Sequence, residues 1–152
     1  MSTAEILRRL RLFLLVLASM LFAGTLLELY LVNHYEDAIQ WIAFVLAGLG
    51  LLVSLIVLAR RGPATVRLLR WCMILVILGS LFGVYEHVSN NIAFEQEILP
   101  GASWRHLFWR GISGANPLLA PGTLAIAGLL SLAATYKFAI TGDNDNFTGL
   151  QD

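Results

Sequence analysis

Apolar residues follow one another along this chain in four long runs that are separated by shorter polar segments. The first run covers residues 12–32 and contains a single charged residue, Glu28. The others cover about residues 38–59, 70–88 and 117–139. A helix needs about 20 predominantly apolar residues to cross the hydrocarbon core of a bilayer. The pattern therefore predicts an all-α fold, a bundle of four transmembrane helices arranged as two hairpins.

The segment between the third and fourth runs carries a helical pattern of its own. Its apolar side chains recur at helical spacing within residues 103–112: Trp104, Leu107, Phe108 and Ile112. Because tryptophan concentrates at the level of the lipid headgroups, this segment is predicted to be a short interfacial helix. The third helix is expected to continue past the membrane to about Leu99, where Pro100 and Gly101 end it.

One domain is expected to hold all four crossings, over residues 1–142, and a polar cytoplasmic tail is expected over residues 143–152. The first apolar run is longer than the roughly 7–15 apolar residues of a signal peptide. It is therefore expected to be a membrane span and not a cleaved leader.

Composition agrees with the hydropathy pattern. Hydrophobic residues make up 58% of the 152 residues and charged residues 13%, against about 45–50% and about 25% in soluble domains. The net charge is zero, which gives no indication of nucleic-acid binding. The single cysteine, Cys72, excludes an internal disulfide and a Cys-x-x-Cys pair. No hydrolase, nucleotide-binding or metalloprotease motif occurs in the sequence, which favours a protein that is not an enzyme.

The charged residues are distributed unevenly between the two ends of the predicted bundle. Eight of the ten basic residues fall on the side of the two termini, and the positive-inside rule then places both termini in the cytoplasm. The predicted location is the cytoplasmic membrane, which the chain crosses several times. Six acidic residues and all three histidines fall on the outward side: Glu28, Glu36, Asp37, Glu86, Glu95, Glu97, His34, His87 and His106. Acidic residues contribute little to orientation, so topology alone does not require them there.

These outward residues contain the candidate functional site. His87, Asn91 and Glu95 recur every four residues and are expected on one face of the third helix. Glu28 and His34, at the outer end of the first helix, are expected opposite that face, because an up-and-down bundle brings these ends together. Histidine and carboxylate ligands suit zinc, iron or manganese. The sequence therefore predicts a divalent-metal site formed by Glu28, His34, His87, Asn91 and Glu95, with the polar cap of a helical bundle as the simpler explanation of the same residues.

Two further functions are compatible with the sequence. His34 and His87 are also candidate axial ligands of a haem b. Alternatively, the chain is an accessory or structural subunit that binds a second copy of itself or another membrane protein. That interpretation uses the tryptophan-rich segment and a face of small residues in the second helix, where close helix contact in lipid is possible: Ala43, Ala47, Gly50 and Ser54.

Three stretches of the sequence carry a resemblance: NHYED from residue 33, GVYEHVSNNIAFEQE from residue 83, and ANPLLAPGTLAIAGLLSLAATYKF from residue 115. Together they resemble a group of small bacterial four-helix membrane proteins. The resemblance implies a bacterial cytoplasmic membrane and supplies no activity. Within the three stretches, the resemblance rests on these positions: His34, Tyr35, Glu36, Asp37, His87, Asn91, Phe94, Glu95, Glu97, Pro117, Ala120, Pro121 and Gly122.

Overall fold

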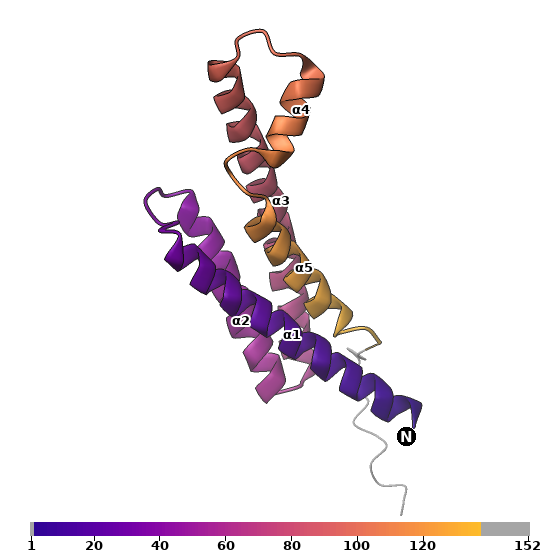
Figure 1. The fold of residues 1–152 in the computed structure, drawn as a ribbon. Coiled ribbons are helices and arrows are strands. Elements are labelled where there is room, and N and C mark those ends of the chain that lie inside the picture. Colours follow the sequence, from indigo (N-terminus) through magenta and orange to yellow (C-terminus); the bar gives the residue numbers. More distant parts are fainter. Residues whose placement is uncertain (1, 138–152) are drawn as a thin grey trace, which may run out of the picture.

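The computed structural model describes residues 2–137, and this part of the chain is helical without any strand. Five helices follow one another: α1 (Thr3–Leu31), α2 (Gln40–Ala59), α3 (Pro63–Ile98), α4 (Trp104–Ser113) and α5 (Leu119–Ala133) (Figure 1). The predicted all-α class is confirmed for these residues. The predicted tail, residues 143–152, lies outside the described residues.

Four of the helices pack together along their lengths. α1 contacts α2 and α5, and α3 contacts α2 and α5, so the two predicted hairpins form one bundle. α4 contacts α3 alone and folds back along its far end, away from the N-terminus (Figure 1). This arrangement gives the molecule a basic end, at the start of α1 and the α2–α3 connection. Its opposite, acidic end comprises the α1–α2 connection and the tip of α3 with α4.

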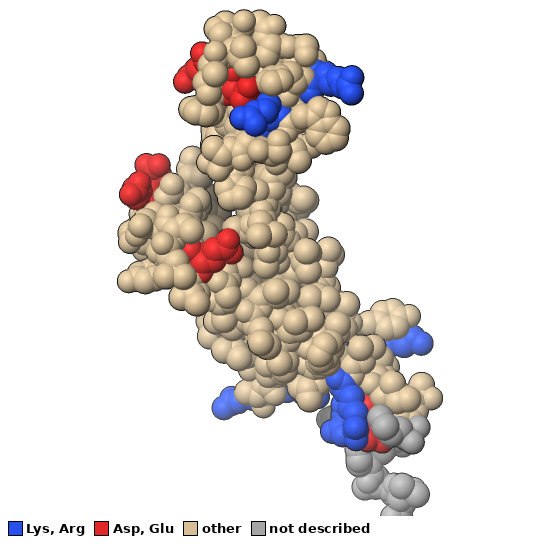
Figure 2. Space-filling view, in the orientation of Figure 1, with Lys and Arg blue, Asp and Glu red and all other residues tan. Residues whose placement is uncertain are grey.

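Three helices, α1, α2 and α3, are long and apolar enough to cross a membrane, and α5 is a shorter apolar helix. The distribution of side chains supports a membrane environment. Large apolar side chains such as Phe13, Met20 and Val45 are more than 60% exposed. The interior combines apolar side chains such as Phe22, Leu69 and Met73 with small polar ones: Ser19, Thr25, Ser54, Ser80, Ser131 and Thr135. Figure 2 shows a broad surface without charged residues between the two ends, which indicates a helical membrane protein.

α3 is longer than a membrane crossing requires. Its 36 residues correspond to about 54 Å, against about 30 Å for the hydrocarbon core. The helix begins at Pro63, a favourable first position, and Gly62 N–H donates to the Thr65 hydroxyl at 3.0 Å. It ends at Ile98, as predicted from Pro100 and from Gly101, whose φ is +91°. The last turns of α3 and α4 together form an outer hairpin that projects from the bundle.

The small-residue face of α2 packs inside the chain. Ala47, Gly50 and Ser54 are buried, and Gly50 lies against the ring of Phe22 in α1. Close approach of the two backbones is the expected use of such a face in lipid. Because this face is occupied within the chain, it gives no support to docking of a partner protein.

The starts of α2 and α5 have no side-chain cap. α2 begins at Gln40, whose side-chain oxygen accepts the N–H groups of Glu36 and Asp37 in the preceding connection. Pro121 lies within the first turn of α5, where an N–H has no intrahelical acceptor, so it interrupts no hydrogen bond.

Candidate functional site

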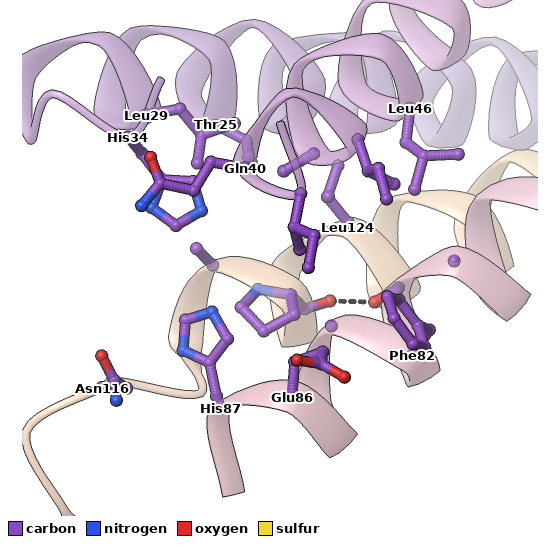
Figure 3. A pocket seen from close by; sticks show the side chains of 18 of the residues that line it. Thr25, Leu29, His34, Gln40, Leu46, Phe82, Glu86, His87, Asn116 and Leu124 are labelled. Atoms are coloured by element: carbon purple, nitrogen blue, oxygen red, sulfur yellow. Dashed lines mark hydrogen bonds between the residues drawn. The ribbon is translucent and has the colours of Figure 1, made fainter. Parts of the chain in front are cut away.

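A cavity of about 720 Å³ lies toward the acidic end, between the α1–α2 hairpin and the α3–α5 pair (Figure 3). Its apolar wall includes Leu29, Leu46, Phe82 and Leu124. Its polar lining residues include Thr25, Glu28, His34, Asp37, Gln40, Glu86, His87, Asn90 and Asn116. A mostly apolar cavity of this size with a few polar groups is typical of a small-ligand site.

The end of α1 fixes the position of His34. Asn33 takes a left-handed conformation, with φ at 53°, which asparagine tolerates better than most residues. The His34 N–H donates to the Leu29 carbonyl at 2.9 Å, and the Asn33 N–H donates to the Tyr30 carbonyl at 3.2 Å. This pair of bonds is a Schellman motif, the usual way to end a helix. The motif holds the His34 backbone beside the cavity instead of leaving it in an open loop.

His34 and His87 face each other across the cavity (Figure 3). Their ring centroids are 6.2 Å apart and the ring planes are inclined by 33°. Burial, and secondarily the nearby His87, lower the pKa of His34, so its imidazole is neutral at pH 7 and available as a ligand. The Nδ1 atom of His87 is buried and has no hydrogen-bond partner among the described residues.

Carboxylates from three segments line the same cavity: Glu28 of α1, Asp37 of the α1–α2 connection and Glu86 of α3. Glu28 lies three residues from the end of α1, nearer to the helix end than the apolar run implied. The hydroxyl of Thr25 also lines the cavity and has no partner among the described residues, although Thr25 is only 2% exposed. Water or a ligand in the cavity would supply hydrogen-bond partners to these two buried atoms.

Asn91 belongs to a different part of the molecule. Its side-chain amide is 2% exposed and donates to the carbonyls of Gly111 and Asn116, at 3.0 Å each. Its side-chain oxygen accepts the Asn116 N–H at 2.8 Å. Asn91 therefore ties α3 to the end of α4 and to the segment that leads into α5.

The carboxylate of Glu95 is also bound by side chains of α4. One carboxylate oxygen is 2.7 Å from Nε2 of His106 and the other accepts from Nε of Arg110 at 2.9 Å. Glu95 is 5% exposed, and the hydrogen bonds from His106 and then Arg110 lower its pKa. His106 and Arg110 were not predicted as partners. The available signal was a pair of basic groups one helical turn apart in a segment that follows an acidic helix end.

These bonds give the outer hairpin a defined response to acid. Because the folded-state pKa of Glu95 is lowered, its stabilising contribution is complete above its ordinary pKa of about 4.3 and is lost as the pH falls below that value. We expect the fluorescence of Trp104 and Trp109 to report opening of α4 as the pH falls through the lowered pKa of Glu95. Glu95→Gln is expected to weaken the hairpin at neutral pH and to remove the acid-dependent step. The exposed Glu97→Gln serves as a control, and loss of the step in that variant would contradict the assignment.

The structure thus divides the five predicted ligands into two groups. Glu28, His34 and His87 line one cavity, whereas Asn91 and Glu95 bind α4. Within residues 2–137, no three histidine, cysteine or acidic side chains converge closely enough to hold a metal ion as they stand. No family model matches this chain, and no curated protein or solved structure is similar enough to count as a match.

Proposed function

We propose that this protein binds a divalent metal ion, zinc, iron or manganese, in the cavity between His34 and His87. The observation that carries the proposal is the pair of imidazoles facing each other at 6.2 Å in a cavity also lined by three carboxylates. Imidazole and carboxylate together are the ligands these ions prefer. The binding is non-enzymatic.

The separation of the two rings is close to what one ion requires. With metal–nitrogen bonds of about 2.0–2.1 Å, two imidazoles on a tetrahedral ion have ring centroids about 5 Å apart. The observed separation of 6.2 Å therefore exceeds the separation on one ion by about 1 Å. Glu28, Asp37 and Glu86 are the nearest source of a third and fourth ligand, since all three line the cavity.

A haem b between the same histidines is the less favoured ligand. Two axial imidazoles on one haem iron also lie about 6 Å apart between centroids, so the distance suits either ligand. The lining of the cavity favours the metal ion over haem. Carboxylates complete the coordination shell of a divalent ion but have no comparable role beside the apolar face of a porphyrin. Purified protein without a Soret absorption band would exclude haem.

The proposed topology has four crossings, with α5 and the residues after it as the fourth, both termini in the cytoplasm, and a bacterial cytoplasmic membrane. Packing of α5 along both α1 and α3 supports a fourth crossing. α4 is proposed to meet the membrane interface. Its exposed aromatic side chains support this placement, because Trp104 is 73% and Trp109 is 59% exposed.

The same exposed side chains support the second candidate function, an accessory subunit of a larger membrane complex or of a homo-oligomer. α4 contacts only α3, so Trp104, Phe108 and Trp109 are free to contact a partner. If α4 docks on a partner, Trp104→Ala together with Trp109→Ala separates the complex while metal content stays unchanged. Crosslinking in membranes followed by size-exclusion chromatography distinguishes this function from the first.

Metal binding is tested on full-length protein that is purified without a polyhistidine tag and stripped with a chelator. We expect calorimetry and elemental analysis to give one zinc, iron(II) or manganese ion per chain. His34→Ala and His87→Ala should each lower the affinity more than about tenfold, since even groups behind a ligand cost 10–100-fold.

His106→Ala is the matched control, because His106 binds Glu95 in the outer hairpin and lies outside the cavity. Glu95→Gln is a second control for the same reason. Unchanged affinity in His34→Ala and His87→Ala would contradict the proposal, as would an equal loss in His106→Ala.

A further inference from the structure

A second cavity, of about 300 Å³, lies at the basic end of the molecule, where α1, α2, α3 and α5 converge. Most of its wall is apolar, formed by Leu12, Leu15, Val57, Val66, Leu69 and Ala134. Three arginines line it as well: Arg8 and Arg11 of α1, and Arg61 of the α2–α3 connection. The cavity thus combines a concentrated positive charge with an apolar wall.

Two of the other arginines at this end, Arg9 and Arg70, have polar partners, whereas Arg60 and Arg67 form no ion pair among the described residues and do not line the cavity. Arg9 forms an ion pair with Glu5 at 2.6 Å. Arg70 donates to the Thr135 hydroxyl at 3.0 Å and to the Thr135 carbonyl at 2.8 Å. Among residues 2–137, no acidic side chain forms an ion pair with Arg8, Arg11 or Arg61.

Arg11 carries the most specific indication of a ligand. One of its terminal nitrogens donates to the Tyr136 carbonyl, which holds the guanidinium against the end of the bundle. Its Nε atom is buried and has no acceptor among the described residues. A buried donor without an acceptor is costly, and a donor on a charged group is costlier. An anionic oxygen in the cavity would supply the missing acceptor.

We propose that this cavity binds the phosphate group of an anionic phospholipid, with the glycerol and the start of an acyl chain along the apolar wall. Guanidinium groups suit phosphate because their N–H donors match its oxygens in pairs. Basic pockets between transmembrane helices are a recognised form of site for anionic headgroups. The positive-inside rule accounts for arginines at this end, but it does not account for three of them converging on one cavity.

Full-length protein in a neutral detergent is the material for the test, with dioleoyl phosphatidylglycerol, dioleoyl phosphatidylcholine and inorganic phosphate as probes. Native mass spectrometry counts bound lipids and a thermal scan measures stabilisation. We expect phosphatidylglycerol to bind and to raise the melting temperature more than the other two probes. Arg11→Gln and Arg61→Gln are each expected to weaken phosphatidylglycerol binding by about fivefold, since one basic residue near a membrane surface contributes about 1 kcal/mol.

Arg67→Gln is the matched control, because Arg67 is exposed at the same end, removes the same charge and does not line the cavity. An equal loss in Arg67→Gln would overturn the proposal, as would unchanged binding when Arg11 and Arg61 are replaced together. Equal stabilisation by phosphatidylcholine would also overturn it. Inorganic phosphate that stabilises as strongly as the lipid would overturn the lipid assignment.

Three aspartates in residues 138–152 offer another anion for the same arginines, and they lie outside the described residues: Asp143, Asp145 and Asp152. Replacing all three with asparagine separates this source from lipid. We expect the triple variant to bind phosphatidylglycerol at least as tightly as the wild type. A loss of binding in that variant would contradict the proposal.

Discussion

Asn91→Asp is expected to open the outer hairpin, at a cost of about 2–4 kcal/mol in the free energy of unfolding. The amide of Asn91 donates to two carbonyls, those of Gly111 and Asn116. A carboxylate has the same shape but cannot donate, so the substitution places a buried negative charge against two carbonyl oxygens. The Asn91 side chain is enclosed, since a Cβ on Gly114 would lie 2.5 Å from its Cγ. The variant therefore cannot relax by turning the carboxylate aside.

This substitution should also change the geometry of the cavity. Asn116 bonds to Asn91 through both its N–H and its carbonyl, and Asn116 lines the cavity that holds His34 and His87. A carboxylate at position 91 still accepts the Asn116 N–H but repels the Asn116 carbonyl, which loosens the segment before α5. We therefore expect a weaker metal affinity in Asn91→Asp together with the loss of stability.

Chemical denaturation in detergent, followed through Trp104 and Trp109, measures the change, and hydrogen exchange of the α4 amides locates it. Asn90→Asp is the control for stability alone: Asn90 is the neighbouring residue, is exposed and undergoes the same chemical change, but it lines the cavity and so is no control for metal affinity. Its stability should stay within about 0.5 kcal/mol of the wild type. Equal stability of the two variants would show that the Asn91 bonds contribute nothing.

The sequence predicted most of the helical architecture because each signal was local. Long apolar runs marked α1, α2 and the membrane part of α3, and the Pro100–Gly101 pair marked the end of α3. The meeting of His34 and His87 was also predictable, because an up-and-down bundle brings the outer ends of its first and third helices together. The start of α2 was less predictable, because no side chain caps it and the Gln40 oxygen accepts N–H groups of the preceding connection.

Asn91 and Glu95 show where sequence spacing was insufficient. Four residues advance a helix by slightly more than one turn, so each step rotates the side chain by about 40°. Glu95 therefore lies about 80° around α3 from His87, although both belong to one repeat of four residues. That rotation turns Glu95 away from the cavity and toward α4. Where α4 folds back depends on the turn at Gly101 and on packing of Leu107, which no local pattern specified.

Gly50→Val is expected to separate α1 from α2 and to cost about 3 kcal/mol, at the upper end of the usual range for overpacking. A Cβ at Gly50 would lie 2.5 Å from both Cε1 and Cζ of Phe22. Phe22 is 0% exposed and is one of the largest enclosed side chains, so its ring has no free space to enter. The backbones of α1 and α2 must therefore move apart. Glu28 and His34, at the end of α1, move with that helix.

The matched control is Gly48→Val, because Gly48 lies in the same helix and a Cβ there meets nothing within 4 Å. Both variants change helix propensity equally, so the difference between them isolates the contact with Phe22. A smaller side chain at position 22 should relieve the clash: Phe22→Leu combined with Gly50→Val is expected to be less destabilised than the sum of the two single variants. Additive free energies in that cycle would mean that Gly50 and Phe22 are not coupled. In that case the position of His34 would not depend on the packing of α1 against α2.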